Sequence, residues 1–378
     1  MADVLIIGDS MRSSELRHEV PIAIPDPFLY AEVGGERHVA ISSMEKTRID
    51  ELGTDLQVHP LEEFGVDELI ARNLPAAEFS REVWLAAARG IGVTSALTPT
   101  NFPLGHADHM RANGIELRAD PLHFAERRRV KNETELEGIR RACRAAEAGL
   151  RAGLELLQGA DRAGGQLVLD GEQLTCERVK QAVEQAFGEH GAAADEFIVS
   201  HGTQTAVGHD MGSGPIAAND IVLFDLFPRD RETGCFADFT RTFTLGPAPE
   251  EIQEYHRLSR EALDRAVKLV RPGLNGAELH RELCDFFYEH GHKTQLHKAE
   301  GEVLSDGFYH ATGHGVGLEV HEAPRLGRNG DDFVAGDVIA IEPGLYRQGF
   351  GGVRLEDLVL VTEDGAEVLT SFPYDLEL

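Results

Sequence analysis

The chain has 378 residues, 42% of them hydrophobic and 27% charged, a composition typical of a globular protein with more than one core. Its formal net charge of -29 argues against a nucleic-acid partner, because 65 acidic residues against 36 basic ones would repel a phosphate backbone. No apolar run is long enough for a membrane helix, and the N-terminus lacks the basic lead of a signal peptide. The four cysteines form no CxxC pair, so we expect reduced thiols in a cytoplasmic protein.

The first part of the chain reads as a small α/β domain. Residues 28–33 and 37–41 flank a Gly-Gly-Glu turn, which predicts a β-hairpin. Ser80 precedes an amphipathic segment closed by Gly90, which predicts a capped helix. The composition turns basic over residues 120–131, where we expect a linker. The predicted domains are residues 1–125 and 126–378.

The second part combines long helices with apolar strands. Amphipathic helices are expected from Asn132 and from Pro249, and each is followed by a shorter helix that ends in the letters EHG, at 189–191 and at 289–291. This repetition suggests two helix-helix-strand halves with a site at their seam. Turn residues separate the expected strands, so we predict an α+β fold whose mostly antiparallel sheet is covered on one side by helices. The expected strands are residues 196–201, 221–227, 235–245, 337–341 and 354–362.

Two of these strands contain an acid where an apolar residue is expected. Asp225 lies in IVLFDLF and Asp238 in CFADFTRTF, and a buried carboxylate needs a cation, a hydrogen-bonding cage or a proton. Adjacent antiparallel strands can bring the two acids to one level. For Asp238 an alternative is a cross-strand ion pair with Arg241 or Arg229.

Two further acids and one histidine extend this pattern. Glu342 ends an apolar strand, Glu356 starts another, and His314 lies among glycines in ATGHGVG. Glycine allows close backbone approach, although a Gly-rich turn with unremarkable surface and core histidines is the alternative. Four carboxylates in one pocket would repel one another unless two divalent cations neutralised them. Oxygen ligands with one imidazole favour Mn, Co or Zn, and two such ions generate a hydroxide able to attack an acyl carbon.

These motifs resemble those of the pita-bread metallopeptidases, the group of methionine aminopeptidase, aminopeptidase P and prolidase. The resemblance covers residue 132 to the C-terminus and implies a pita-bread catalytic domain, an antiparallel sheet with pseudo-twofold helix pairs. The first domain resembles the creatinase/prolidase-like N-terminal domain of such enzymes. The implied metal ligands are Asp225 for the first metal, Asp238 and Glu356 as bridges, and His314 and Glu342 for the second.

The resemblance also implies catalytic roles outside the ligand set. Glu342 would carry the proton, while His209 and His321 would steady the substrate carbonyl and the oxyanion. His310 lies four residues before the implied ligand His314, and His321 lies seven after it. These three histidines match the HxxxHxxxxxxH pattern of the proline-specific members; for His310 a surface histidine is the alternative. Arg354 in GVRLED resembles their GxRxED.

The resulting hypothesis is an Xaa-Pro dipeptidase or aminopeptidase P that uses a hydroxide bridging two divalent ions, with Mn favoured over Co or Zn. We expect small peptide substrates and a homodimer without membrane or nucleic-acid partners. The alternatives are a methionine aminopeptidase, a metal-free creatinase-like hydrolase and a non-catalytic binding protein on the same fold. Two departures from the family pattern are an Asp225–Asp238 interval two residues longer than usual and an extended segment, residues 292–308, that suggests a lid or a dimer contact.

Overall fold

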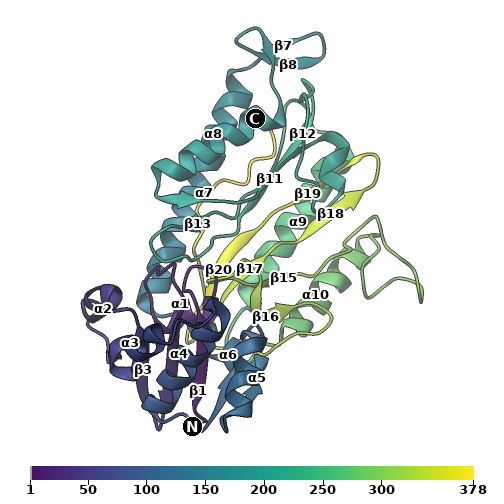
Figure 1. Ribbon diagram of the computed structural model, residues 1–378. Helices are drawn as coiled ribbons and strands as arrows, with labels where there is room; N and C mark the ends of the chain where they lie inside the picture. Colours follow the sequence, from purple (N-terminus) through teal and green to yellow (C-terminus); the bar gives the residue numbers. More distant parts are fainter. Residues whose placement is uncertain (1) are drawn as a thin grey trace. The chain divides into compact units, whose positions relative to one another are not determined.

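The structure is a computed structural model that describes residues 2–378. The chain divides into two compact units, one ending at Arg128 and the other spanning Arg129–Leu378 (Figure 1). Among the described residues, no helix combines the length and the apolar character that a membrane span requires.

The first unit is an α/β domain, as predicted. Its mixed sheet has the strand order β4-β3-β2-β1-β5-β6. The strands are β1 (Val4–Gly8), β2 (Phe28–Val33), β3 (Glu36–Ile41), β4 (Gln57–Pro60), β5 (Ser95–Thr98) and β6 (Glu116–Ala119). The helices are α1 (Ser14–Glu19), α2 (Ser43–Asp50), η1 (Leu61–Phe64), α3 (Val66–Ala71), α4 (Ala76–Ile91), α5 (Leu104–Ala112) and α6 (Pro121–Arg129).

The structure confirms the hairpin and adjusts one helix. Strands β2 and β3 pair in antiparallel register around a two-residue turn, Gly34-Gly35, whose φ angles of 60° and 90° only glycine adopts easily. Helix α4 begins at Ala76 rather than after Ser80, because Pro75 sets its first turn. It ends at Ile91, and the residue that caps it is Gly92, with φ of 97°, rather than the predicted Gly90.

The segment expected to be a linker, residues 120–131, contains the junction of the two units, but most of it is helical. Residues 121–129 form helix α6, and the predicted boundary between residues 125 and 126 falls inside it. The Asp120 carboxylate accepts a hydrogen bond from the backbone of His123 at the start of the helix. Arg127 forms ion pairs with Glu19 at 2.7 Å and Glu32 at 2.8 Å. Arg127 is therefore neutralised by two acids of the first unit, a tertiary effect that local composition does not reveal.

The second unit contains the two predicted helix pairs, α7 (Glu133–Gly159) with α8 (Cys176–Glu189) and α9 (Glu250–Leu269) with α10 (Gly276–Glu289). Asn132 and Glu135 form a capping box at the start of α7. The repeated EHG explains how both shorter helices end. His190 and His290 contact the carbonyl oxygens four residues earlier through Nδ1, at 3.0 and 2.8 Å, and the following glycines have positive φ.

Antiparallel sheets occupy the rest of this unit (Figure 1). One has the order β11-β12-β14, a second β16-β15-β17-β20-β21, and β18 pairs with β19. Their strands are β11 (Ile198–His201), β12 (Ile221–Asp225), β14 (Thr240–Thr244), β15 (Gly313–Gly315), β16 (Glu322–Leu326), β17 (Val338–Ile341), β18 (Gly344–Arg347), β19 (Gly351–Arg354), β20 (Asp357–Val361) and β21 (Ala366–Val368). Smaller elements are β7 (Asp161–Ala163), β8 (Gln166–Leu169), β9 (Glu172–Gln173), β10 (Ala192–Ala193), β13 (Arg229–Asp230) and η2 (Gly202–Ala206).

The central strands are buried on both faces, whereas the sequence predicted helices on one side only. Val338 and Ala340 of β17 enter the apolar cluster that includes α7 and α8, while Ile339 and Ile341 enter the cluster of α9 and α10. The prediction of an α+β fold with an antiparallel sheet is confirmed. The expected strand 235–245 is shorter, beginning at Thr240. The acids of interest consequently lie at strand ends.

Candidate metal centre

Strand termini carry the four candidate acids. Asp225 is the last residue of β12 and Asp238 lies two residues before β14, while Glu342 directly follows β17 and Glu356 directly precedes β20. His314 occupies the middle of β15. Because backbone pairing ends at these positions, the acids escape the fully apolar interior of the strands while staying on a rigid frame.

Backbone hydrogen bonds fix the acids relative to one another. Strands β12 and β14 are antiparallel neighbours, as predicted, with Asp225 opposite Thr240. The backbone N–H of Glu356 donates to the Thr240 carbonyl at 3.1 Å, which joins the two larger sheets. The Thr240 hydroxyl also donates to the Glu356 carboxylate at 2.7 Å. One threonine therefore holds both the backbone and the side chain of this acid.

The glycines beside His314 permit close backbone approach. A Cβ on Gly313 would lie 1.8 Å from the Ala340 carbonyl oxygen, and one on Gly315 would lie 2.1 Å from that of Ala323. No side chain fits at either position. The His314 Nδ1 donates to the Gly315 carbonyl at 3.1 Å, so its Nε2 keeps a free lone pair.

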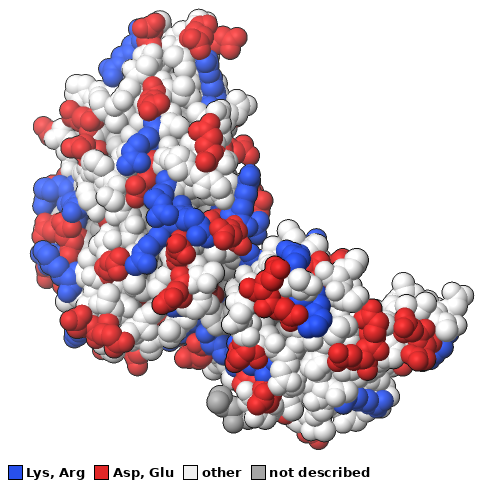
Figure 2. Space-filling model, turned by 90° about the vertical axis from the view of Figure 1, so that its left-hand side faces the viewer, with Lys and Arg blue, Asp and Glu red and all other residues white. Residues whose placement is uncertain are grey.

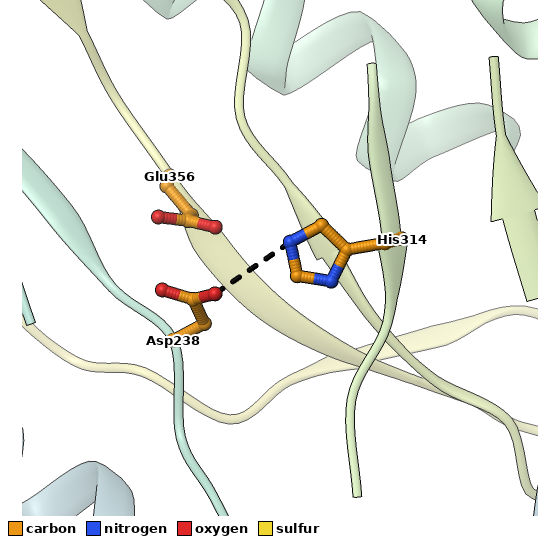
Figure 3. A group of neighbouring side chains, drawn as sticks. All are labelled: Asp238, His314 and Glu356. Carbon is orange, nitrogen blue, oxygen red and sulfur yellow. Dashed lines mark ion pairs between the residues drawn. The ribbon is translucent and has the colours of Figure 1, made fainter. Parts of the chain in front are cut away.

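Three of the candidate ligands converge on one point. Ligand atoms of Asp238, His314 and Glu356 lie within 4.8 Å of one another, and Figure 3 shows the two carboxylates and the ring meeting from three separate segments. The His314 Nε2 is 3.6 Å from Asp238 Oδ2 and 3.9 Å from Glu342 Oε1. These separations suit atoms that share a cation better than direct hydrogen bonds.

Asp225 connects to this group through Arg354. The Arg354 Nη2 donates to Asp225 Oδ2 at 2.5 Å. The other carboxylate oxygen, Oδ1, is buried and has no hydrogen-bond partner among the described residues. A buried, unpartnered carboxylate oxygen beside a cluster of acids fits a metal ligand.

The electrostatics of the cluster fit a cation as well. Burial, and then the charges of Glu356 and Asp225, raise the pKa of Asp238 well above its ordinary value. Burial, and then the charges of Asp225 and Glu342, raise the pKa of Glu356 well above its ordinary value, and burial raises that of Glu342 to about 7. Four carboxylates face one guanidinium, so divalent ions would supply the missing positive charge.

Comparison with known proteins identifies the family. The model of "Metallopeptidase family M24" matches residues 137–363. The chain belongs to metallopeptidase family M24. An Xaa-Pro dipeptidase of Pyrococcus furiosus is 32% identical to it over 251 residues, 65% of this chain and 64% of that protein. An Xaa-Pro dipeptidase of Pyrococcus horikoshii is 30% identical over 314 residues, 80% of each chain.

The fold of this M24 peptidase also agrees with solved structures. The structure of an Xaa-Pro dipeptidase from Bacillus anthracis superposes with a TM-score of 0.78, covering 100% of this chain and 95% of that one at 22% sequence identity. The pita-bread fold predicted from the motifs is thereby confirmed. The chain is a peptidase, a hydrolase whose family implies the use of divalent metal.

The remaining predicted histidines of the peptidase border the acids. His310 contacts the Ala311 carbonyl through Nδ1 at 2.7 Å and the Tyr346 hydroxyl through Nε2 at 2.9 Å. Burial lowers its pKa to about 3. Both ring nitrogens have partners within the protein, which argues against the surface histidine considered from the sequence. The ring of His321 packs edge-on against His314, with 4.3 Å between centroids.

His209 lies on an exposed turn after η2. The carbonyl of the preceding Gly208 accepts a hydrogen bond from Arg354 Nη1 at 3.4 Å, which brings this turn next to Arg354. Burial is the largest cause of the lowered pKa of His321. The structure thus brings the predicted ligands and catalytic residues into one neighbourhood, and their individual roles stay predictions.

Sequence reasoning missed Tyr346. Its buried hydroxyl accepts a hydrogen bond from Arg354 Nη1 at 3.2 Å and lies 2.9 Å from His310 Nε2, linking the two. In GLYR it reads as an ordinary strand aromatic. The only available signal was its place four residues after Glu342 in a run that ends the apolar strand.

The ion-pair alternative for Asp238 is wrong. Arg241 pairs with Asp357 at 2.9 Å, and Arg229 lies over the ring of Phe236. The end of the segment 292–308 is attached to β18, since the Gly307 N–H donates to the Tyr346 carbonyl at 2.8 Å, while Val303 in its middle is 90% exposed. Whether that segment is a lid or a dimer contact stays a prediction.

Proposed function

We propose that this M24 peptidase hydrolyses the bond between an N-terminal residue and proline with the help of two divalent metal ions. The observation that carries the metal requirement is the convergence of ligand atoms of Asp238, His314 and Glu356 within 4.8 Å, with Glu342 Oε1 3.9 Å from His314 Nε2. The buried Asp225 oxygen, which has no hydrogen-bond partner among the described residues, adds to it. The proline preference rests on the His310 pattern and on relatives that are named Xaa-Pro dipeptidases.

The residues to hold the ions are Asp225, Asp238, His314, Glu342 and Glu356. When bound, such ions acidify water and polarise a peptide carbonyl. Oxygen-rich ligation with one imidazole favours Mn, with Co and Zn as alternatives. Arg354 would hold the Asp225 carboxylate in place, because its Nη2 donates to Asp225 at 2.5 Å and its Nη1 donates to the Tyr346 hydroxyl at 3.2 Å.

The chain's own groups would handle the proton and the developing charge. Glu342 lies 3.9 Å from His310 and is the acid best suited to accept a proton from the attacking water and deliver it to the proline nitrogen. His321 borders the ligand His314 and carries a lowered pKa, so it is a neutral donor at physiological pH. His321 and His209 would donate to the substrate carbonyl and the oxyanion.

One assay tests this proposal. Protein treated with chelator and then supplied with Mn, Co or Zn is assayed on Ala-Pro, Ala-Pro-Ala and Met-Ala. We expect no hydrolysis without metal, restoration by Mn, and preference for the two proline substrates. Activity that survives full chelation would overturn the metal requirement, and faster cleavage of Met-Ala would overturn the proline specificity. The ratio of Ala-Pro to Ala-Pro-Ala separates a dipeptidase from an aminopeptidase P.

A further inference from the structure

Arg241 is a fully buried arginine whose five N–H groups are all used. Its partners are Pro373 O (Nε, 3.2 Å), Thr240 O (Nη1, 2.9 Å), Glu356 O (Nη1, 2.7 Å), Asp357 Oδ1 (Nη2, 2.9 Å) and Phe372 O (Nη2, 3.1 Å). A guanidinium carries five donors, so no donor is left over. Lysine, with three donors from one point, cannot reproduce this set.

These bonds connect three separate segments. Thr240 begins β14, Glu356 precedes β20, and residues 372–373 belong to the C-terminal tail. The guanidinium also lies over two rings, 4.5 Å from the centroid of Phe239 and 4.0 Å from that of Tyr374. The tail thus covers Arg241 with both carbonyl oxygens and an aromatic face.

Asp357 is the counter-charge, and the tail holds it too. Thr370 donates to Asp357 Oδ1 at 2.8 Å, and the Tyr374 hydroxyl donates to Oδ2. Among the described residues, the hydrogen bonds that the Asp357 carboxylate accepts come from Arg241 and from residues 370–374.

The hydrogen bonds of Arg241 reach the backbone of the proposed ligand Glu356. The backbone N–H of Glu356 donates to Thr240 O, its carbonyl accepts from Arg241, and its side chain accepts from the Thr240 hydroxyl. Thr240 O is in turn held by Arg241. The direction of the Glu356 carboxylate toward Asp238 and His314 accordingly depends on Arg241.

We propose that the C-terminal tail, residues 370–374, sets the metal affinity of the site by holding Arg241, which positions Glu356. Arg241, Asp357 and Tyr374 are positioning residues that do not touch substrate. The proposal rests on Glu356 being a metal ligand, as assigned under the proposed function. Partners that orient a ligand from behind are worth about 10- to 100-fold in metal affinity.

The test compares two tyrosines that each donate to a carboxylate. Tyr374→Phe removes the donor to Asp357 and keeps the ring over Arg241. Tyr255→Phe is the matched control, because Tyr255 donates to Glu251 at 2.6 Å on α9, and Glu251 is not one of the proposed metal ligands. Calorimetric titration of the full-length, metal-free proteins with Mn gives the affinity, and thermal unfolding with and without Mn gives the metal-induced rise in Tm.

We expect Tyr374→Phe to weaken Mn binding by about tenfold, the lower end of the range for such partners, and to reduce the metal-induced rise in Tm. Tyr255→Phe should leave both unchanged. Arg241→Lys, which keeps the charge and loses the fork, should weaken Mn binding more than Tyr374→Phe. If Tyr374→Phe lowers the Tm equally with and without Mn and leaves the affinity unchanged, the tail is only a structural cover.

The two proposals fail differently. Wild-type protein that binds no Mn would sink the proposed function and its ligand set. Wild-type protein that binds Mn and cleaves Ala-Pro, together with a Tyr374→Phe variant of equal affinity, would sink only the positioning role of the tail. If Arg241→Lys does not fold, Tyr374→Phe still tests the positioning role of the tail, because it removes a single hydroxyl and keeps the ring.

Discussion

Two buried arginine–aspartate pairs each join the segment 225–241 to the segment 354–357, and their hydrogen bonding differs. Arg354 pairs with Asp225 at 2.5 Å and Arg241 with Asp357 at 2.9 Å, and both arginines are almost fully buried. The Asp357 carboxylate receives hydrogen bonds from Arg241, Thr370 and Tyr374. The Asp225 carboxylate keeps one buried oxygen that has no hydrogen-bond partner within residues 2–378.

This difference separates a structural pair from a ligand-binding one. A buried ion pair whose donors and acceptors are all used has no capacity for another group, and it costs free energy to break. A buried pair with an unused acceptor, next to three more carboxylates, retains capacity for a cation. Burial alone does not distinguish the two arginines, whereas the completeness of hydrogen bonding does.

The largest effect is expected at the four acids Asp225, Asp238, Glu342 and Glu356, which we call the unsaturated cluster because one of their buried oxygens is unused. Asp238→Asn removes a carboxylate that the ions need, so Xaa-Pro hydrolysis should fall at least about a thousandfold, and Mn content with it. The same change removes a charge that its neighbours repel. Because the pKa of Asp238 is raised in the folded protein, the Tm of the metal-free variant at pH 7.5 should be higher than that of metal-free wild type.

Activity assays, metal analysis and thermal unfolding of the chelated proteins measure these quantities. A lower Tm for metal-free Asp238→Asn would show that the carboxylate is satisfied as it stands, and the contrast between the two pairs would not hold.

The opposite change in stability is expected at Arg241 and Asp357, which we call the saturated pair because all their hydrogen-bonding groups are used. Asp357→Asn leaves the buried Arg241 guanidinium without a counter-charge, so the free energy of unfolding should fall by about 3–5 kcal/mol. Urea unfolding gives this value from the midpoint, provided the slope is unchanged. A loss below about 1 kcal/mol would mean that the backbone carbonyls around Arg241 suffice.

The sequence predicted the acids of the first cluster because each interrupts an apolar run. Asp225 and Asp238 are anomalous in their strands, and antiparallel pairing of those strands follows from the short connection. The pairing of Arg241 could not be predicted, because Asp357 is 116 residues away and the tail that completes the arrangement has no motif. Tyr346 escaped notice for a similar reason, since its partners Arg354 and His310 meet it only in the folded chain.

The same limit applies to the fold. The hairpin at Gly34-Gly35 and the capping box at Asn132 are local and were predictable. Helix α6 was read as a linker because the acids that neutralise Arg127 lie about a hundred residues earlier. Local signals define element ends, and distant partners decide what a charged segment becomes.

Metal removal should make stability depend on pH through the unsaturated cluster. The pKa of Glu342 is raised from 4.5 to about 7 in the folded protein, so the folded state binds an extra proton between these values. The stability of metal-free protein should therefore decrease as pH rises from about 4.5 to about 7, and level off above. Thermal unfolding at several pH values measures this. Glu342→Gln should lose most of the dependence, and an unchanged profile would assign it to other groups.

The smallest effect is expected for the hydroxyl that joins Arg354 to His310. Tyr346→Phe keeps the buried ring and removes the acceptor for Arg354 and the contact with His310 Nε2. Because one hydrogen bond to a charged group is lost while the ligands stay, kcat on Ala-Pro should fall about tenfold and Mn affinity should not change. Tyr374→Phe, which alters the saturated pair, should show the reverse: weaker Mn binding, and kcat near that of wild type once Mn is in excess. If both variants lower Mn affinity alike, Tyr346 also positions the metal ligands. The contrast between an Arg354 pair that acts in catalysis and an Arg241 pair that positions a ligand would then be wrong.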